Sequence, residues 1–107
     1  MSFSEDIMRL RYSWDNEDGS KESWEQISKR VVENVFSVTK TIDFDFSEIK
    51  EKIERIISER KFIPGGRFLA QAGRDYHQTN NCFLLRVEDT REGWADVAQK
   101  ATVMLMS

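Results

Sequence analysis

The sequence is poor in the residues that build covalent or metal-bound scaffolds. Its 107 residues include one cysteine, one histidine and one proline. A single thiol excludes an internal disulfide and a cysteine-rich metal site, so no metal site is expected in this chain. This cysteine usage is typical of the reducing cytosol, and we expect a cytoplasmic protein.

Strong charge and long apolar runs are also missing. The net charge of -3 is mild and spread along the chain, which leaves no basic surface for nucleic acid or for a membrane. No apolar run approaches the roughly 18 residues of a membrane span. Residues 1–6 lack the basic start and apolar centre of a signal peptide. We therefore expect neither nucleic acid nor a membrane as a partner.

The N-terminal arm leaves two structures open. Apolar side chains alternate from Met8 to Trp14, as in a strand, whereas Phe3, Ile7 and Leu10 have the spacing of a helix. Residues 15–20 have the composition of a turn.

A first amphipathic helix is predicted after this turn. Ser23 and Gln26 form a capping-box pattern, in which each side chain bonds the backbone amide of the other residue. The apolar face comprises Trp24, Ile27, Val31, Val35 and Val38. The polar residues fall mostly on the opposite face: Glu22, Glu25, Lys29, Arg30 and Glu33.

A second helix is predicted from Phe46 to about Arg60. Asp45 and Glu48 form a second capping-box pattern at its start. The helix must end before Pro64, because the residue preceding a proline disfavours helical angles.

Residues 62–93 contain the only proline, histidine and cysteine and four of the five glycines. Pro64 to Arg67 predict a bend, either a plain turn or a close backbone approach to a ligand; the spacing is not that of a P-loop or a dinucleotide fingerprint. The apolar run from Cys82 to Val87 predicts a buried strand.

Cys82 follows four hydrogen-bonding side chains, residues 78–81. Two interpretations stay open at this point: a small core residue, or a thiol placed for redox chemistry. His77 has no partner at catalytic spacing and is interpreted as a hydrogen-bonding residue.

A last helix is predicted from Thr90 to the end of the chain. Asp89 is interpreted as its N-cap, with Glu92 completing a third capping-box pattern. No glycine, asparagine or proline ends the pattern before Ser107, so we expect a piece of a longer protein. The apolar face comprises Trp94, Val97, Ala98, Ala101, Met104 and Leu105.

Three blocks of this region, taken together, resemble the N-terminal part of ribonucleotide reductase catalytic chains. The blocks are Pro64–Gly73, His77–Cys82 and Val87–Trp94, and their common order and spacing are more specific than any one block. The resemblance is greatest over residues 60–107 and is closest to the adenosylcobalamin-dependent class, class II.

The resemblance implies a mostly α chain with one or two short strands. Residues 1–61 would be a helical N-terminal domain that carries part of an effector site and a dimer contact. Residues 62–107 would be the first strand and helix of a ten-stranded α/β barrel, cut short. The last helix should then expose an apolar face, because the rest of the barrel that would cover Val97, Ala101 and Met104 is missing.

The resemblance also implies an enzyme that reduces ribonucleoside di- or triphosphates to deoxyribonucleotides by thiyl-radical chemistry. Cys82 would be one of two thiols that reduce the substrate and are reduced again by a thioredoxin-type protein. Asp89 and Thr90 would contact a deoxynucleotide effector. Adenosylcobalamin would be the cofactor, bound mainly by sequence outside this chain, and the 107 residues alone would be inactive.

The substrate-binding residues implied by the resemblance are Gly66, Arg67, Phe68 and Asn81. Many relatives carry a Ser/Thr-Pro-Thr pattern where this chain has Gly-Arg-Phe. The resemblance therefore implies that glycine amides and Arg67 take the place of a hydroxyl contact to the substrate.

Two alternatives remain. One is a fragment of a class I large subunit, whose radical comes from a metal-bearing small subunit. The other is a small helical protein-interaction module in which Cys82 is a structural residue. The choice of di- or triphosphate, the effectors and the oligomeric state are not specified by the sequence.

Overall fold

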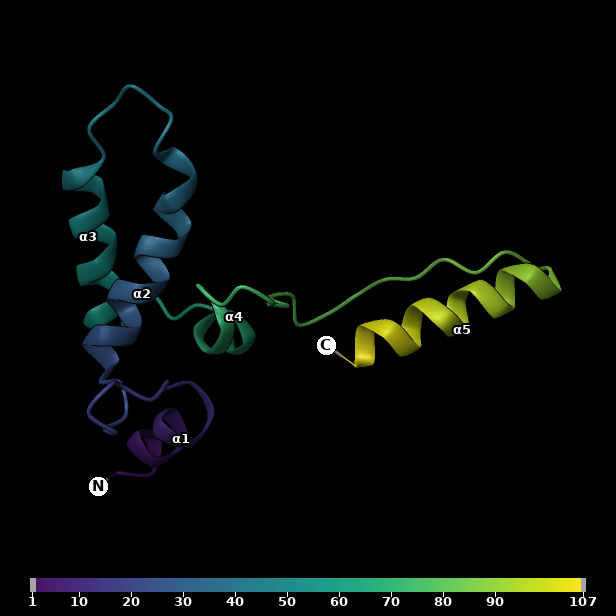
Figure 1. The fold of residues 1–107 in the computed structure, drawn as a ribbon, viewed down its shortest axis with the longest axis horizontal. Helices are drawn as coiled ribbons and strands as arrows, with labels where there is room; N and C mark the ends of the chain where they lie inside the picture. Colours follow the sequence, from purple (N-terminus) through teal and green to yellow (C-terminus); the bar gives the residue numbers. More distant parts are fainter. Residues whose placement is uncertain (1, 107) are drawn as a thin grey trace.

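The computed structural model describes residues 2–106 and consists of helices joined by loops (Figure 1). The predicted mostly α fold is confirmed. Over the described residues, the only β pairing is an isolated bridge between Asp15 and Lys21. Met1 and Ser107, the outer ends of the two predicted domains, lie outside the described residues. The elements are α1 (Phe3–Arg11), α2 (Trp24–Phe36), the 3-10 helix η1 (Ser37–Thr39), α3 (Ser47–Ser58), α4 (Gly66–Gln71) and α5 (Arg91–Leu105).

The N-terminal arm adopts the helical alternative. Ser2 caps α1, because its hydroxyl accepts a hydrogen bond from the Glu5 amide and the Glu5 carboxylate accepts one from the Ser2 amide. The Ser2 backbone bond is the main reason that the pKa of Glu5 lies below its ordinary value. An extended arm would have needed a partner strand to pair its backbone groups, whereas a capped helix pairs most of them locally.

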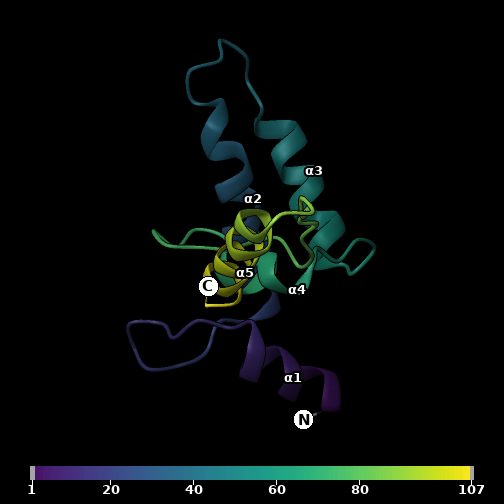
Figure 2. The same cartoon turned by 90° about the vertical axis from the view of Figure 1, so that its right-hand side faces the viewer.

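Helices α2 and α3 form a hairpin, and they lie side by side in both ribbon views (Figures 1 and 2). The predicted capping box of Ser23 and Gln26 is present at the start of α2. The Trp24 indole nitrogen donates to the Ile57 carbonyl oxygen at 2.9 Å and joins the start of α2 to the end of α3.

The predicted capping box at the start of α3 is wrong. Helix α3 begins at Ser47, and its N-cap position, Phe46, makes no side-chain cap. The Asp45 carboxylate accepts instead from the hydroxyl and the amide of Ser47, which hold the pKa of Asp45 below its usual range. The Asp45 side chain thus bonds Ser47, two residues later, as aspartate side chains often do in turns. It is therefore not available to cap the helix.

The hydrophobic core lies where α2, α3 and α4 meet. Its buried apolar residues are Trp24, Ile27, Val31, Val32, Ile57, Leu69 and Ala72. The core thus crosses residue 61, where the sequence predicted a boundary between domains, because α4 packs onto α2. A division into two domains at that point stays a prediction.

Ile27 and Val38 were assigned to one apolar face, but their burial differs. Ile27 is fully buried, whereas Val38 lies in η1 with 77% of its surface exposed. Ile27→Ala is expected to lower the free energy of unfolding by about 2–5 kcal/mol, because it leaves a cavity in packed core. Val38→Ala is expected to change it by less than about 0.5 kcal/mol. Urea unfolding of both variants by circular dichroism checks this, and equal losses would contradict the assigned core.

The predicted strand from Cys82 to Val87 is wrong. These residues have no regular secondary structure, and Leu84 is 97% exposed. A strand needs a neighbour to pair its backbone hydrogen-bonding groups, and within residues 2–106 no β pairing involves this segment. The segment instead leads away from the α2–α3 hairpin to α5 (Figure 1).

Helix α5 starts one residue later than its predicted cap implies. Thr90 is the N-cap, since its hydroxyl accepts from the Gly93 amide at 2.9 Å, so the assignment of Asp89 as N-cap is wrong. All residues of α5 are described and none is buried. The expected exposure of its apolar face holds only in part. Trp94 is 64% exposed, whereas Val97, Ala101 and Met104, the three residues predicted to be exposed, are half-buried. No helix within residues 2–106 is long and apolar enough to span a bilayer.

Candidate functional site

A groove of about 630 Å³ runs between the α2–α3 hairpin and the segment that leads to Cys82. It brings together three residues that the resemblance places at the substrate or in catalysis: Phe68, Asn81 and Cys82. The lining residues are Val31, Val32, Val35, Phe36, Ile53, Ile57, Phe62, Pro64, Gly65, Phe68, Thr79, Asn80, Asn81 and Cys82. The groove is thus apolar on the helical side and polar beside the thiol.

The glycine pair gives the predicted close approach, but to side chains of this chain. A Cβ atom on Gly65 would lie 2.8 Å from the side-chain nitrogen of Asn81, so Asn81 packs directly on the Gly65 backbone. A Cβ atom on Gly66 would lie 3.2 Å from the Tyr12 hydroxyl. Gly66 and Arg67, both half-buried, are the first residues of α4 and are not among the groove's lining residues.

Cys82 is a free, exposed thiol. The polar loop before it is ordered by local hydrogen bonds. The Gln78 amide donates to the side-chain oxygen of Gln71, and the Asn80 amide donates to that of Gln78, each at 2.7 Å. The loop therefore starts from α4 and returns to the bend at Gly65.

His77 has the hydrogen-bonding role predicted for it. Its Nδ1 donates to the Arg74 carbonyl oxygen at 2.7 Å. Within residues 2–106, no group of three or more histidine, cysteine, aspartate or glutamate side chains is arranged to hold a metal ion.

The two predicted effector-binding residues lie away from the groove. Asp89 and Thr90 are exposed and directly precede α5, at the end of that helix farthest from the α2–α3 hairpin (Figure 1). The structure therefore brings Phe68, Asn81 and Cys82 together and leaves Asp89 and Thr90 apart from them.

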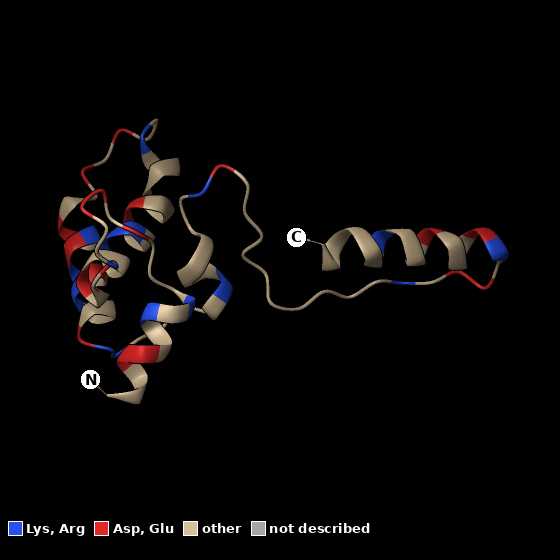
Figure 3. Cartoon of the chain, turned by 60° about the horizontal axis from the view of Figure 1, so that its bottom comes forward, with Lys and Arg blue, Asp and Glu red and all other residues tan. Residues whose placement is uncertain are grey.

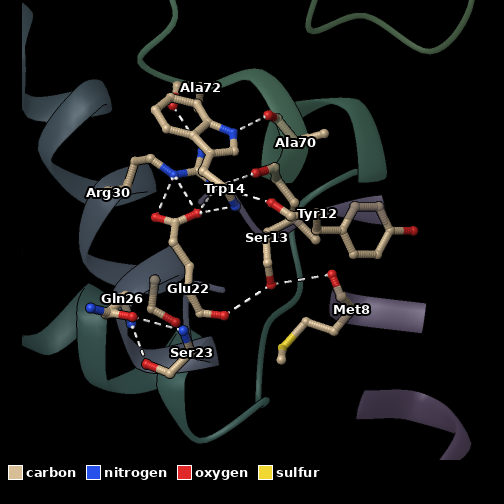
Figure 4. Close-up of polar contacts among 12 residues, drawn as sticks. Met8, Tyr12, Ser13, Trp14, Glu22, Ser23, Gln26, Arg30, Ala70 and Ala72 are labelled. Atoms are coloured by element: carbon tan, nitrogen blue, oxygen red, sulfur yellow. Dashed lines mark hydrogen bonds and ion pairs between the residues drawn. The ribbon is translucent and has the colours of Figure 1, made fainter. Parts of the chain in front are cut away.

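The sequence interpretation missed a buried polar cluster under α4 (Figure 4). Arg30 and Glu22, expected on the polar face of α2, form an ion pair of 3.1 Å with about a tenth of each side chain exposed. The indole ring of Trp14 lies 3.9 Å from the Arg30 guanidinium, measured to the ring centroid. The one signal in the sequence was the position of Arg30, three residues after Ile27, at the edge of the apolar face.

The remaining charges are spread over the exposed surface. Acidic and basic side chains alternate over the helices without gathering by sign (Figure 3). Three ion pairs join residues four apart on exposed helix faces: Glu48–Lys52, Glu51–Arg55 and Asp96–Lys100. Such exposed pairs contribute little to stability, whereas loss of one partner of the buried pair, Glu22 or Arg30, would leave a buried charge without compensation.

Comparison with known proteins places this arrangement in a family. Searches among curated proteins and among solved structures gave no match. Residues 2–77 match the family model described as "ribonucleotide reductase, all-alpha domain". The matched range contains the whole core, α1 to α4 and the buried cluster around Arg30, and ends before Cys82. Because the match covers well over half of the chain, this protein belongs to the ribonucleotide reductase family.

Proposed function

We propose that this chain is the N-terminal part of a class II ribonucleotide reductase and that Cys82 is one of its two substrate-reducing thiols. The observation that supports the proposal is the groove, where Cys82 lies with Asn81 and Phe68 beside a fixed glycine bend. A thiol that must face one ribose carbon needs a rigid support of this kind.

In the proposed reaction, two thiols are oxidised to a disulfide while the 2′ carbon of the ribose is reduced. A thiyl radical on a cysteine outside this chain removes the ribose 3′ hydrogen and later returns it. The 2′ hydroxyl leaves as water, and Cys82 and a second thiol outside this chain supply two electrons and two protons. The products are a deoxyribonucleotide and a disulfide, which a thioredoxin-type protein reduces again.

The other site residues have assigned roles in the proposal. Phe68 and Asn81 contact the substrate from the groove, while Gly66 and Arg67 contribute from the first turn of α4. Asp89 and Thr90 contact a deoxynucleotide effector. The enzyme is proposed to work in the cytoplasm, with the remainder of the reductase chain and a second copy as partners.

Adenosylcobalamin, which generates the radical in class II enzymes, does not fit the residues described here. The single imidazole of the chain, His77, already bonds the Arg74 carbonyl oxygen through Nδ1. We assign the cofactor to sequence outside this chain, and no step of the reaction is derived through it.

The test is to read the coding sequence beyond Ser107 and to assay the chain it specifies. Ribonucleotide reduction by that chain with adenosylcobalamin and a dithiol, without a second subunit, would support the proposal. Reduction only with a metal-bearing small subunit would replace class II by class I. A stop codon after Ser107, with no reductase remainder in the genome, would overturn the proposal and favour the interaction module. The isolated 107 residues are the negative control and are expected to be inactive.

A further inference from the structure

The C-terminal end of α4 is held by side chains from two other parts of the chain. Every carbonyl oxygen from Phe68 to Ala72 has a donor. The Phe68 carbonyl oxygen accepts from the Ala72 amide, and the Gln71 carbonyl oxygen accepts from the Arg74 amide. The other three bond side chains: Leu69 to Arg30 at 2.7 Å, Ala70 to the indole nitrogen of Trp14 at 2.6 Å, and Ala72 to Arg30 at 2.9 Å.

A buried cation stabilises the C-terminal end of α4. The last carbonyls of a helix lack partners within the helix, and a cation is favourable beside them. Here the cation is Arg30, which is fixed in turn by Glu22 and by the stacked ring of Trp14. A helix of six residues would not be stable alone, so its position is set by this clamp and by the burial of Leu69.

Helix α4 in turn holds the loop that carries Cys82. Gln71, its last residue, accepts from the Gln78 amide, and Gly65, its N-cap, supports the side chain of Asn81. The loop is therefore fastened to both ends of one short helix, and Cys82 follows directly after the second attachment.

We propose that Trp14 and Arg30 are positioning residues for Cys82: their clamp on the C-terminal end of α4 fixes the helix, and the helix fixes the thiol at the groove. The biological meaning of this inference rests on the proposed redox role of Cys82. The mechanical coupling does not, and it is measurable in the 107-residue chain without any reductase activity.

If Trp14 only stabilised the fold, its loss would affect the Cys82 loop no more than the loss of any other tryptophan that stabilises the fold equally. Trp24 is a matched control for this comparison. Trp14 and Trp24 each donate one indole hydrogen bond to a backbone carbonyl, at 2.6 and 2.9 Å. The Trp14 acceptor is in α4 and the Trp24 acceptor, Ile57, is in α3. Replacing either tryptophan by phenylalanine keeps an aromatic ring and removes that bond.

The experiment compares Trp14→Phe and Trp24→Phe with the unchanged chain. Two readouts are used: hydrogen exchange of the Gln78 amide and of the Asn80 amide, which are both hydrogen-bonded in the loop before Cys82. For Trp14→Phe, both are expected to rise by roughly two- to tenfold, the factor that corresponds to one lost hydrogen bond. For Trp24→Phe, both are expected to stay within a factor of about two even if global stability falls equally.

Equal changes in the two variants, or none in Trp14→Phe, would overturn the proposal. If Trp14→Phe does not fold, Gln71→Met takes its place, because it breaks the link between α4 and the loop at a site outside the core. That variant must raise the exchange rate of the Asn80 amide by a similar factor, and an unchanged rate would again overturn the proposal. Loss of redox function in the complete enzyme, with the coupling intact, would reject the proposed function alone.

Discussion

In the complete reductase chain, Cys82→Ala is expected to abolish repeated turnover with a thioredoxin-type reductant while the ribonucleotide still binds. Alanine has no thiol that can be oxidised, so no disulfide forms and the 2′ carbon is not reduced. Binding should persist, because Phe68 and the apolar wall of the groove are unchanged. Turnover is measured as deoxyribonucleotide formed per enzyme, and affinity by equilibrium binding.

Two further variants make this result specific. Cys82→Ser keeps the size and polarity of the thiol and is expected to fail in the same way, which separates redox chemistry from packing. Tyr76→Ala removes a 95% exposed side chain from the same loop and is expected to leave turnover unchanged. Full turnover by Cys82→Ala would show that the thiol is structural.

Arg30→Met is expected to cause a large loss of stability. The change leaves the Glu22 carboxylate, about a tenth exposed, without its cation, and leaves the carbonyls of Leu69 and Ala72 without a donor. Removing one partner of a buried ion pair typically costs about 3–5 kcal/mol. That is comparable with the whole stability of many small domains. Urea unfolding should show a chain that is partly unfolded in water.

The matched control is Arg55→Met on the surface of α3. Arg55 also pairs with a glutamate, Glu51, at 3.5 Å, but about two thirds of its side chain is exposed. Its loss is expected to change the free energy of unfolding by less than about 1 kcal/mol. Similar losses for Arg30→Met and Arg55→Met would mean that the buried cluster does not hold the fold together.

Local patterns predicted the helices of the hairpin, because capping and apolar spacing are properties of neighbouring residues. Ser23 and Gln26 cap α2 as predicted, and α3 ends before Pro64. The strand at Cys82 was mispredicted for a related reason. An apolar run shows that a segment has something to bury, but only a partner elsewhere in the chain can make it a strand.

The candidate site was predicted in part. The resemblance selected Phe68, Asn81 and Cys82, and the structure places them on one groove. The clamp of Trp14 and Arg30 was not visible, because its bonds join residues 39 to 56 positions apart in the sequence. Helical periodicity assigned Arg30 to the polar face, since spacing along one helix says nothing about which carbonyls another element will present to it.

The placement of the core also has a consequence for the order of events during synthesis. Within residues 2–106, the seven buried apolar residues all lie in the range from Trp24 to Ala72. A ribosome releases the chain from its N-terminus, and compact units fold as they emerge. The groove's helical wall and the clamped α4 can therefore be complete while the residues after Ala72 are still in the exit tunnel. The loop with Asn81 and Cys82 would then dock last, onto helices that are already folded, and Asn81 would pack on Gly65 at that step.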